Sequence, residues 1–276
     1  QQICAGAGST VKVGVRLTTN PKGLWRKFGI LPEKLAQFWE RAQECTNLRF
    51  QGLQFHTSWN LSPAAQIDFI RHLGQVLSGL PSAALDQIRF IDIGGGYWPP
   101  QGEWLQAAGT SVGKLKMNLG QDPGAPHEHY RLPSCAIEVF AGQISDAVRE
   151  CIHSVVPCRI CVEPGRWLCN DAMHLLLSVV DKKEDDLVIT DAGTNAVGWE
   201  RFETDYFPVI NLSRPALEEK PCHILGSLCT PHDVWGYAYW GEEIRIGDIL
   251  MVPTQGAYTY SLRQHFIKPL PQVIIL

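Results

Sequence analysis

The first two-thirds of the chain alternate between strand-like and helix-like hydrophobic patterns. Short apolar, β-branched runs occupy residues 12–18, 48–56, 88–93 and 159–163. Between them, apolar residues recur at helical spacing over residues 33–45, 63–80 and 136–155, and Ser62 is a candidate cap for the second of these helices. Strands separated by helices predict a parallel β-sheet with crossover helices, which is an α/β fold.

After about Trp167 the pattern changes to short β-type runs with no convincing helices between most of them. The runs are residues 175–180, 186–190, 207–212, 223–228, 248–253 and 272–276, separated by Gly, Pro, Asp and Asn. This pattern predicts a β-rich sandwich or barrel. We therefore expect an α/β domain over residues 1–168 and a C-terminal β domain over residues 169–276.

The α/β part is too short for a closed barrel. Eight strands with their helices need roughly 250 residues, and only about 165 precede the change of pattern. The chain also starts at Gln1, without an initiator methionine. We therefore expect a (β/α) TIM-type barrel whose first strands lie outside this sequence, since half a barrel does not close.

Composition narrows the class of protein. Hydrophobic residues make up 45% of the 276 residues and the net charge is −4, which disfavours disorder and a broad nucleic-acid surface. No apolar run reaches the roughly 18–20 residues of a membrane span, and no N-terminal signal pattern is present. The nine cysteines have no framework spacing and lie mostly beside apolar residues. These features favour reduced thiols in a cytoplasmic protein that binds neither nucleic acid nor membrane.

Three glycines, Gly94, Gly95 and Gly96, follow the buried strand of residues 88–93. Such a cluster exposes backbone N–H groups that suit a phosphate, although a tight turn at a strand end explains it equally well. The dinucleotide pattern G-x-G-x-x-G is absent. The sequence Tyr97-Trp98-Pro99-Pro100 also cannot begin the helix that this pattern requires.

Two further strand ends carry polar residues. Glu163-Pro164-Gly165-Arg166 follows one strand, and His56 ends another, before Thr57 and Ser58. Taken alone, the first is more simply a local ion pair and the second a structural histidine. Because parallel strands end at the same edge of a sheet, the three groups together favour a site there.

Other candidate chemistry is weaker. Cys229 lies in a polar turn close to His232 and Asp233, but this spacing alone does not make a Cys-His pair. Cys158 and Cys161 have metal or redox spacing inside a predicted buried strand, where buried thiols are the simpler interpretation. The sequence His127-Glu128-His129 has no clear third ligand, so we expect no metal site.

Taken in order, these motifs resemble the fold-type III pyridoxal-phosphate-dependent amino-acid decarboxylases, the group that acts on diaminopimelate, ornithine or carboxynorspermidine. The resemblance runs from about Val11 to the C-terminus. The matching stretches are residues 26–29 (RKFG), 52–56 (GLQFH), 91–97 (IDIGGGY), 162–166 (VEPGR), 190–195 (TDAGTN), 226–233 (GSLCTPHD), and 247–248 (GD) leading to 256–259 (GAYT).

The resemblance implies a role for each matched residue. Gly94, Gly95, Gly96, Gly165, Arg166, Ser58 and Tyr258 would hold the phosphate of pyridoxal 5′-phosphate. Glu163 would pair with its pyridine nitrogen, and His56 would stack on its ring. Cys229, contributed by the partner subunit of a homodimer, would return a proton to Cα after carbon dioxide leaves. Thr230, Asp233 and Arg201 would contact the amino-acid substrate.

Some positions depart from the family pattern. The lysine that holds the cofactor belongs to an early barrel strand, and no lysine here has that setting, which agrees with strands missing upstream. Thr230 replaces an acid that often reads the distal amine, and Trp59 alters the pocket wall. The substrate is therefore open among basic and diamino acids of lysine or polyamine biosynthesis. Two other functions remain open: a non-catalytic homologue that binds a partner protein, and a related amino-acid racemase.

Overall fold

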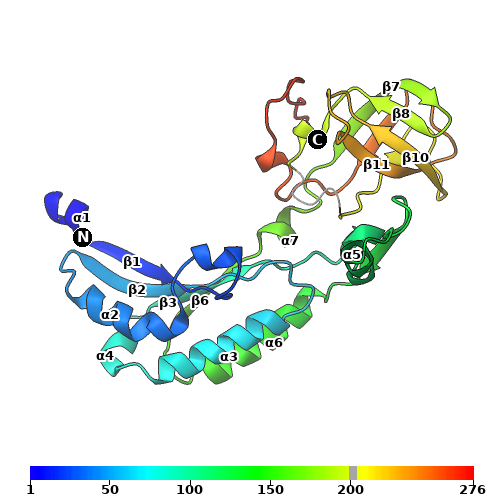
Figure 1. Ribbon diagram of the computed structural model, residues 1–276. Coiled ribbons are helices and arrows are strands. Elements are labelled where there is room, and N and C mark those ends of the chain that lie inside the picture. Colours follow the sequence, from blue (N-terminus) through cyan, green and yellow to red (C-terminus); the bar gives the residue numbers. More distant parts are fainter. Residues whose placement is uncertain (199–203) are drawn as a thin grey trace. The chain divides into compact units, whose positions relative to one another are not determined.

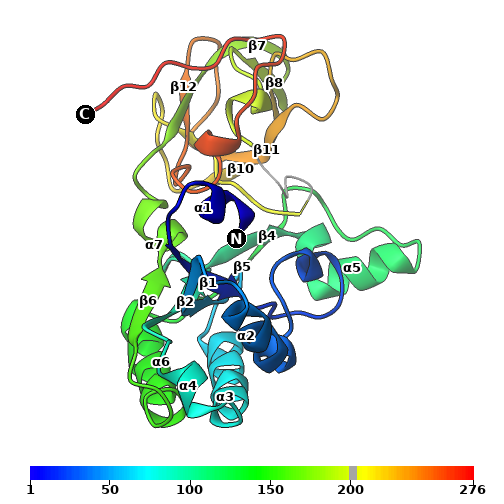
Figure 2. The same cartoon turned by 90° about the vertical axis from the view of Figure 1, so that its left-hand side faces the viewer.

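The computed structural model describes residues 1–198 and 204–276 (Figures 1 and 2). It divides into two compact units, each described by itself below. The first unit contains residues 1–101 and 134–165, and the second contains residues 102–133 and 166–276. Among the described residues, none of the helices combines the length and the apolar character that crossing a bilayer demands.

The first unit is built on a four-stranded sheet in which every pairing is parallel. Its strands, in spatial order, are β1 (Val11–Arg16), β2 (Leu48–Gln54), β3 (Phe90–Gly95) and β6 (Arg159–Glu163). The parallel sheet predicted from the sequence is thus confirmed within this unit. All four strands end at one edge, and each central strand carries apolar side chains that are fully buried.

Helices connect these strands, and one short helix precedes the first strand. The longer ones are α2 (Leu35–Gln43), α3 (Ala64–Ser78) and α6 (Ile137–Cys151), and the short ones are α1 (Gln2–Gly6), α4 (Ser82–Leu85), η1 (Leu24–Lys27) and η2 (Pro32–Lys34). Figure 1 shows α3 and α6 side by side. They approach closely at Gly74, where an added Cβ would lie 2.5 Å from the carbonyl oxygen of Cys151. The expected Ser62 cap is not made, because Pro63 occupies the N-cap position of α3 and no side chain caps the helix.

The second unit contains a closed β-barrel with strand order β10-β11-β9-β12-β7-β8. The strands are β7 (Leu175–Glu184), β8 (Leu187–Thr190), β9 (Ile210–Asn211), β10 (Glu219–Leu225), β11 (Val234–Trp240) and β12 (Ile249–Val252). Its core includes the fully buried Trp235, Val188 and Leu250. The β-rich domain is therefore present, but residues 272–276 form no strand and are mostly exposed, so that prediction is wrong.

Residues 102–133 were expected in the α/β domain, and the structure groups them with the barrel instead. They form β4 (Glu103–Gln106), η3 (Ala107–Gly109), α5 (Ser111–Asn118) and β5 (His129–Leu132). The reason is a set of long-range contacts. The Gln106 N–H donates to the Thr204 carbonyl at 2.9 Å, and the His129 ring stacks on Tyr206 with centroids 3.9 Å apart. Three short helices complete the unit: α7 (Gly165–Cys169), which begins at the division between the units, η4 (Thr194–Ala196) and η5 (Tyr260–Leu262).

Candidate functional site

The carboxyl edge of the parallel sheet brings together three of the residues that the sequence singled out. His56 follows β2, Gly95 ends β3 and Glu163 ends β6. The His56 Nδ1 atom lies 3.2 Å from the Gly95 amide nitrogen and 3.3 Å from Glu163 Oε2. Nδ1 therefore accepts from Gly95 when it carries no proton, and donates to Glu163 when it carries one. Gln54 Nε2 donates to the other Glu163 oxygen at 3.3 Å.

Residues 94–96 are all glycine because neighbouring backbone segments lie close to each of them. Gly94 and Gly96 have φ angles of 69° and 78°, in the left-handed region that side chains with a Cβ rarely adopt. A Cβ at Gly96 would overlap the Thr57 carbonyl oxygen, and one at Gly95 would overlap that of Glu163. Only glycine fits this turn, in which the Gly94 N–H donates to Asp92 and the Gly95 N–H to His56.

Two buried amides support this turn, and the sequence analysis missed both. Asn60 and Gln66 are 5% and 0% exposed, and each donates from its side-chain amide to the Gly95 carbonyl oxygen at 3.2 Å. The Asn60 backbone N–H also donates to the Gly96 carbonyl at 2.9 Å. The sequence did contain one sign of this support, because Gln66 is a polar residue on the apolar face of a predicted helix.

Asp92 adds negative charge next to Glu163. Its Oδ1 atom accepts the Gly94 N–H at 2.9 Å. Burial raises the pKa of Asp92 above its ordinary value, and the charge on Glu163 raises it further, against the lowering effect of the Gly94 hydrogen bond. The edge of the sheet thus holds two carboxylates and one imidazole, a composition suited to a ligand with a cationic ring.

A cleft of about 400 Å³ lies against His56, and Thr57, Ser58, Trp25 and Trp59 contribute to its wall. The Trp25 and His56 rings are stacked at 17°, with centroids 6.4 Å apart. Trp59 has a positive φ of 55°, which is strained for a residue with a large side chain. Ser58 and Trp59 therefore line the same cleft as His56.

In the second unit, Cys229 is exposed within the loop 226–233, which connects β10 and β11. Thr230 lies beside it, and its carbonyl accepts the Asp233 N–H at 3.3 Å. Asp233 was expected to contact substrate, but it is only 2% exposed and both carboxylate oxygens accept hydrogen bonds inside the protein. Arg201, the third expected substrate residue, lies outside the described residues.

The second unit also brings Arg166 and Tyr258 together. The Arg166 guanidinium carbon lies 5.1 Å from the centroid of the Tyr258 ring, a cation–π distance. Tyr258 is 53% exposed and has a φ of 63°. Gly165 is the first residue of α7, directly before Arg166.

The weaker candidates have ordinary surroundings. Burial raises the pKa of Cys158 to about 11, with a further contribution from Cys161, which is typical of an inert thiol. The His129 ring packs on Tyr206 and lies 3.6 Å from Glu219. The described residues contain no group of three His, Cys, Asp or Glu side chains that could hold a metal ion.

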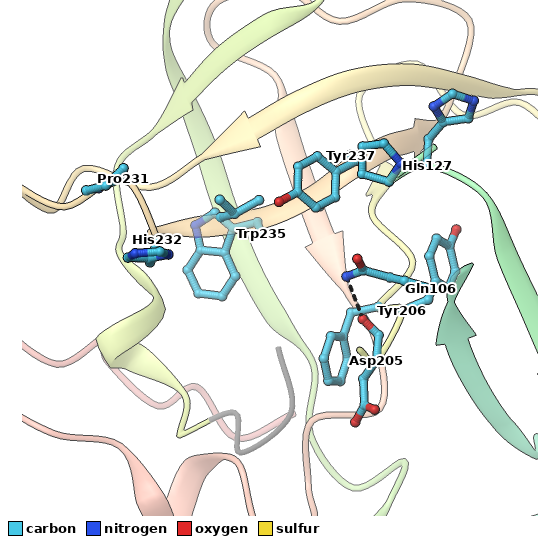
Figure 3. Close-up of a pocket in the computed structure, with 12 residues that line it drawn as sticks. Gln106, His127, Asp205, Tyr206, Pro231, His232, Trp235 and Tyr237 are labelled. Atoms are coloured by element: carbon cyan, nitrogen blue, oxygen red, sulfur yellow. Dashed lines mark hydrogen bonds between the residues drawn. The ribbon is translucent and has the colours of Figure 1, made fainter. Parts of the chain in front are cut away.

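A second cavity, of about 190 Å³, lies in the second unit beside Pro231 and His232 of the Cys229 loop (Figure 3). Figure 3 also shows Gln106 donating to the Asp205 carbonyl, at 2.9 Å. The sequence did not reveal this cavity, because its walls come from four segments far apart along the chain. They are residues 106, 126–127, 205–207 and 231–237.

Comparison with known proteins identifies relatives of the whole chain. It is 24% identical over 263 residues to diaminopimelate decarboxylase from Methanothermobacter thermautotrophicus, covering 92% of this chain and 54% of that protein. It is 24% identical over 260 residues to lysine/ornithine decarboxylase from Selenomonas ruminantium, covering 92% and 57% respectively. The chain thus spans a little over half the length of these relatives.

Solved structures show the same fold. Diaminopimelate decarboxylase from M. jannaschii in co-complex with L-lysine aligns with a TM-score of 0.72 at 22% identity, covering 95% of this chain and 57% of that one. Residues 57–256 match the sequence model of a family described as pyridoxal-dependent decarboxylase, C-terminal sheet domain. This match includes Gly94–Gly96, Glu163 and Cys229 and spans well over half of the chain. The protein therefore belongs to the pyridoxal-dependent decarboxylase family.

Proposed function

We propose that this chain is part of a pyridoxal 5′-phosphate-dependent decarboxylase of a basic or diamino acid. The observation that carries the proposal is the meeting of His56, Gly95 and Glu163 at one sheet edge, with interatomic distances of 3.2 and 3.3 Å. The relatives named above are decarboxylases of diaminopimelate and of lysine and ornithine. Because each of these amino acids carries a second amine, we propose a substrate of the same kind for this protein.

The residues present fit the proposed cofactor. The turn at Gly94–Gly96 has no room for a Cβ at any of its three positions, and a turn made of glycines lets an anion approach the backbone closely. Glu163 has a side chain 44% exposed and an oxygen fixed by Gln54, so it can reach a bound ring. When bound, pyridoxal phosphate supplies an electron sink for charge that develops at Cα.

Each residue of the first unit has a distinct task in this proposal. Glu163 holds a proton on the pyridine nitrogen, since a carboxylate beside a cationic ring favours the charged form. His56 offers a flat ring face for stacking, and its orientation is maintained by the Gly95 N–H and by Thr19, whose hydroxyl donates to the His56 carbonyl at 3.0 Å. Ser58 adds a hydroxyl for the phosphate.

The remaining groups are the backbone of Gly165, the last residue of the first unit, and side chains of the second unit. Arg166 and Tyr258 supply a cation and a hydroxyl for the phosphate, together with the backbone at Gly165. Cys229 donates the proton from its thiol to Cα, with the neighbouring Thr230 at the substrate. We propose that Cys229 serves the active site of the partner subunit in a homodimer, as the family resemblance implies.

The proposed whole protein is larger than this chain. Its α/β part would be a TIM-type barrel in which strands outside this sequence pair with the sheet and supply the lysine that holds the cofactor. The division between barrel and β domain is proposed near residue 168. A cytoplasmic location is favoured because all nine cysteines, each among the described residues, are free thiols.

The test uses the full-length protein loaded with pyridoxal phosphate. Purified protein is assayed for carbon dioxide release from diaminopimelate, lysine, ornithine and carboxynorspermidine, and its intact mass is measured after borohydride reduction. We expect a cofactor adduct and release from one of these substrates, with a large loss of turnover in Cys229→Ala and in Glu163→Gln. Inversion of Cα without carbon dioxide release would indicate the racemase. A protein without adduct would be the non-catalytic homologue.

A further inference from the structure

The loop that carries Cys229 is long for a hairpin connection. β10 and β11 pair up to Leu225 and Val234, and the Gly226 N–H donates to the Asp233 carbonyl at 2.8 Å, closing the base of the loop. Residues 226–233 lie between the strands. A loop of this length, with small and polar residues, samples many conformations unless other contacts restrain it.

We propose that Asp233 is a positioning residue that clamps this loop onto residues 191–194 and so sets the place of the Cys229 thiol. The inference rests on the proposed function, in which Cys229 donates the proton to Cα. It replaces the expectation that Asp233 contacts substrate. No contact between the two units is needed, because every group involved belongs to the second one.

The first argument is the carboxylate itself. Asp233 Oδ2 accepts the Leu228 N–H at 2.7 Å, directly beside Cys229. Asp233 Oδ1 accepts both the backbone N–H and the hydroxyl of Thr194, at 2.7 and 3.0 Å. Hydrogen bonds to an ionised acceptor are stronger than neutral ones. One buried side chain therefore links the two ends of the loop to each other and to a separate segment.

The second argument is that other contacts join the same two segments. The Ser227 hydroxyl donates to the Asp191 carbonyl at 3.1 Å. The Leu228 side chain packs so tightly on Gly193 that a Cβ there would lie 2.7 Å from its Cδ1 atom. Position 226 likewise has room only for glycine, since an added Cβ would lie 2.5 Å from Asp233 Oδ1. The stretches 190–195 and 226–233, separate motifs in the sequence, form a single support for Cys229.

The chain offers a matched control in Asp248. It is 3% exposed, close to the 2% of Asp233, and it also lies in the barrel unit. Its carboxylate accepts from the Asn211 side chain and the Arg245 N–H, both at 2.9 Å, and pairs with Arg214. Asp248→Asn therefore weakens a comparable buried network without touching the Cys229 loop.

The experiment compares Asp233→Asn with Asp248→Asn in the full-length, pyridoxal-phosphate-loaded protein. An asparagine at 233 presents its NH₂ to an N–H donor in either orientation, so at least one hydrogen bond is lost. We expect the amide that faces the new NH₂ group, that of Leu228 or that of Thr194, to exchange its hydrogen about tenfold faster in Asp233→Asn, and both amides to stay within about twofold of wild type in Asp248→Asn. We also expect kcat to fall about tenfold in Asp233→Asn while KM changes less than about twofold.

The outcomes separate the inference from the proposed function. Unchanged exchange at both Leu228 and Thr194 in Asp233→Asn would overturn the clamp, and faster exchange at either amide with unchanged kcat would overturn its role in positioning. A rise in KM with constant kcat would return Asp233 to substrate contact. If Cys229→Ala keeps full turnover, the proposed function of Cys229 fails, whatever Leu228 shows. Should Asp233→Asn not fold, Thr194→Val removes only the hydroxyl bond, and a smaller change in the same direction is expected.

Discussion

Replacing Gly96 by alanine tests whether the glycine turn is as crowded as the structure indicates. Gly96 has a φ of 78°, and a left-handed residue with a Cβ costs roughly 1–2 kcal/mol. The added Cβ would overlap the Thr57 carbonyl oxygen and lie 2.9 Å from Asn60 Nδ2. Forcing atoms into such a packed site adds typically 1–3 kcal/mol. We therefore expect Gly96→Ala to lower the free energy of unfolding by about 3 kcal/mol.

Gly142 provides the matched control, since it belongs to the same unit. It lies inside α6, and a Cβ built there meets no heavy atom within 4 Å. Gly142→Ala should therefore raise the free energy of unfolding by about 0.5–1 kcal/mol, the usual gain for alanine over glycine in a helix.

Urea unfolding followed by circular dichroism measures both variants, and their midpoints are compared at equal slopes. A loss below about 1 kcal/mol in Gly96→Ala would refute the close approach of the turn to Thr57. A loss in Gly142→Ala would show that the space around a glycine does not predict the effect of an added Cβ on stability. Gly96→Ala should also weaken pyridoxal phosphate binding, because the N–H groups of the turn would be displaced.

Three further predictions concern ionisable groups. Burial raises the pKa of Asp248, but the hydrogen bonds from Arg214, Asn211 and Arg245 together hold it below its ordinary value. Its stabilising contribution is thus complete above about pH 4 and is lost as the pH falls through the lowered pKa. Urea unfolding between pH 2 and 6 should show that the free energy of unfolding falls less steeply with decreasing pH in Asp248→Asn than in wild type. Equal slopes in the two proteins would contradict this. Burial and then the Glu219 hydrogen bond raise the pKa of Tyr206 far above 10, so absorbance titrations of wild type and Tyr206→Phe should coincide up to about pH 11 while the protein stays folded. Because burial raises the pKa of Asp92, the stability that its protonated form provides at low pH is lost as the pH rises through that pKa. Asp92→Asn keeps an acceptor for the Gly94 N–H, so it should be more stable than wild type at pH 7. A less stable variant would show that the charge of Asp92 is favourable.

Several elements followed directly from the sequence. The buried strands were predicted within one or two residues at most of their ends, because continuous apolar runs bounded by glycine and proline are local signals. The glycine triplet was recognised as a turn or anion cradle, and the structure adds that Cβ atoms are excluded at all three positions. His56 and Glu163 were expected at one edge because parallel strands end together, and they lie 3.3 Å apart.

Other features depended on partners far away in the chain. Residues 102–133 had no local pattern that separated them from the α/β part, and they join the barrel unit through Thr204 and Tyr206. β11 was not predicted, although its aromatic residues include Trp235, which is the largest fully buried side chain among the described residues. Asp233 was assigned to substrate through the family resemblance, and only the fold shows that it is buried and bonded to Thr194 and Leu228.

The sequence by itself determined the class of the fold, the parallel sheet, the glycine turn and the residues that resemble a pyridoxal-phosphate site. The fold class, the sheet and the turn follow from hydrophobic periodicity and from the backbone freedom of glycine, which are properties of short segments, whereas the site residues follow from the family resemblance. The tertiary structure alone decided which buried polar groups support the site: Asn60 and Gln66 at Gly95, and Asp233 at Leu228 and Thr194. A buried donor or acceptor must find a partner wherever the fold provides one, and that choice exists only after distant segments have packed together.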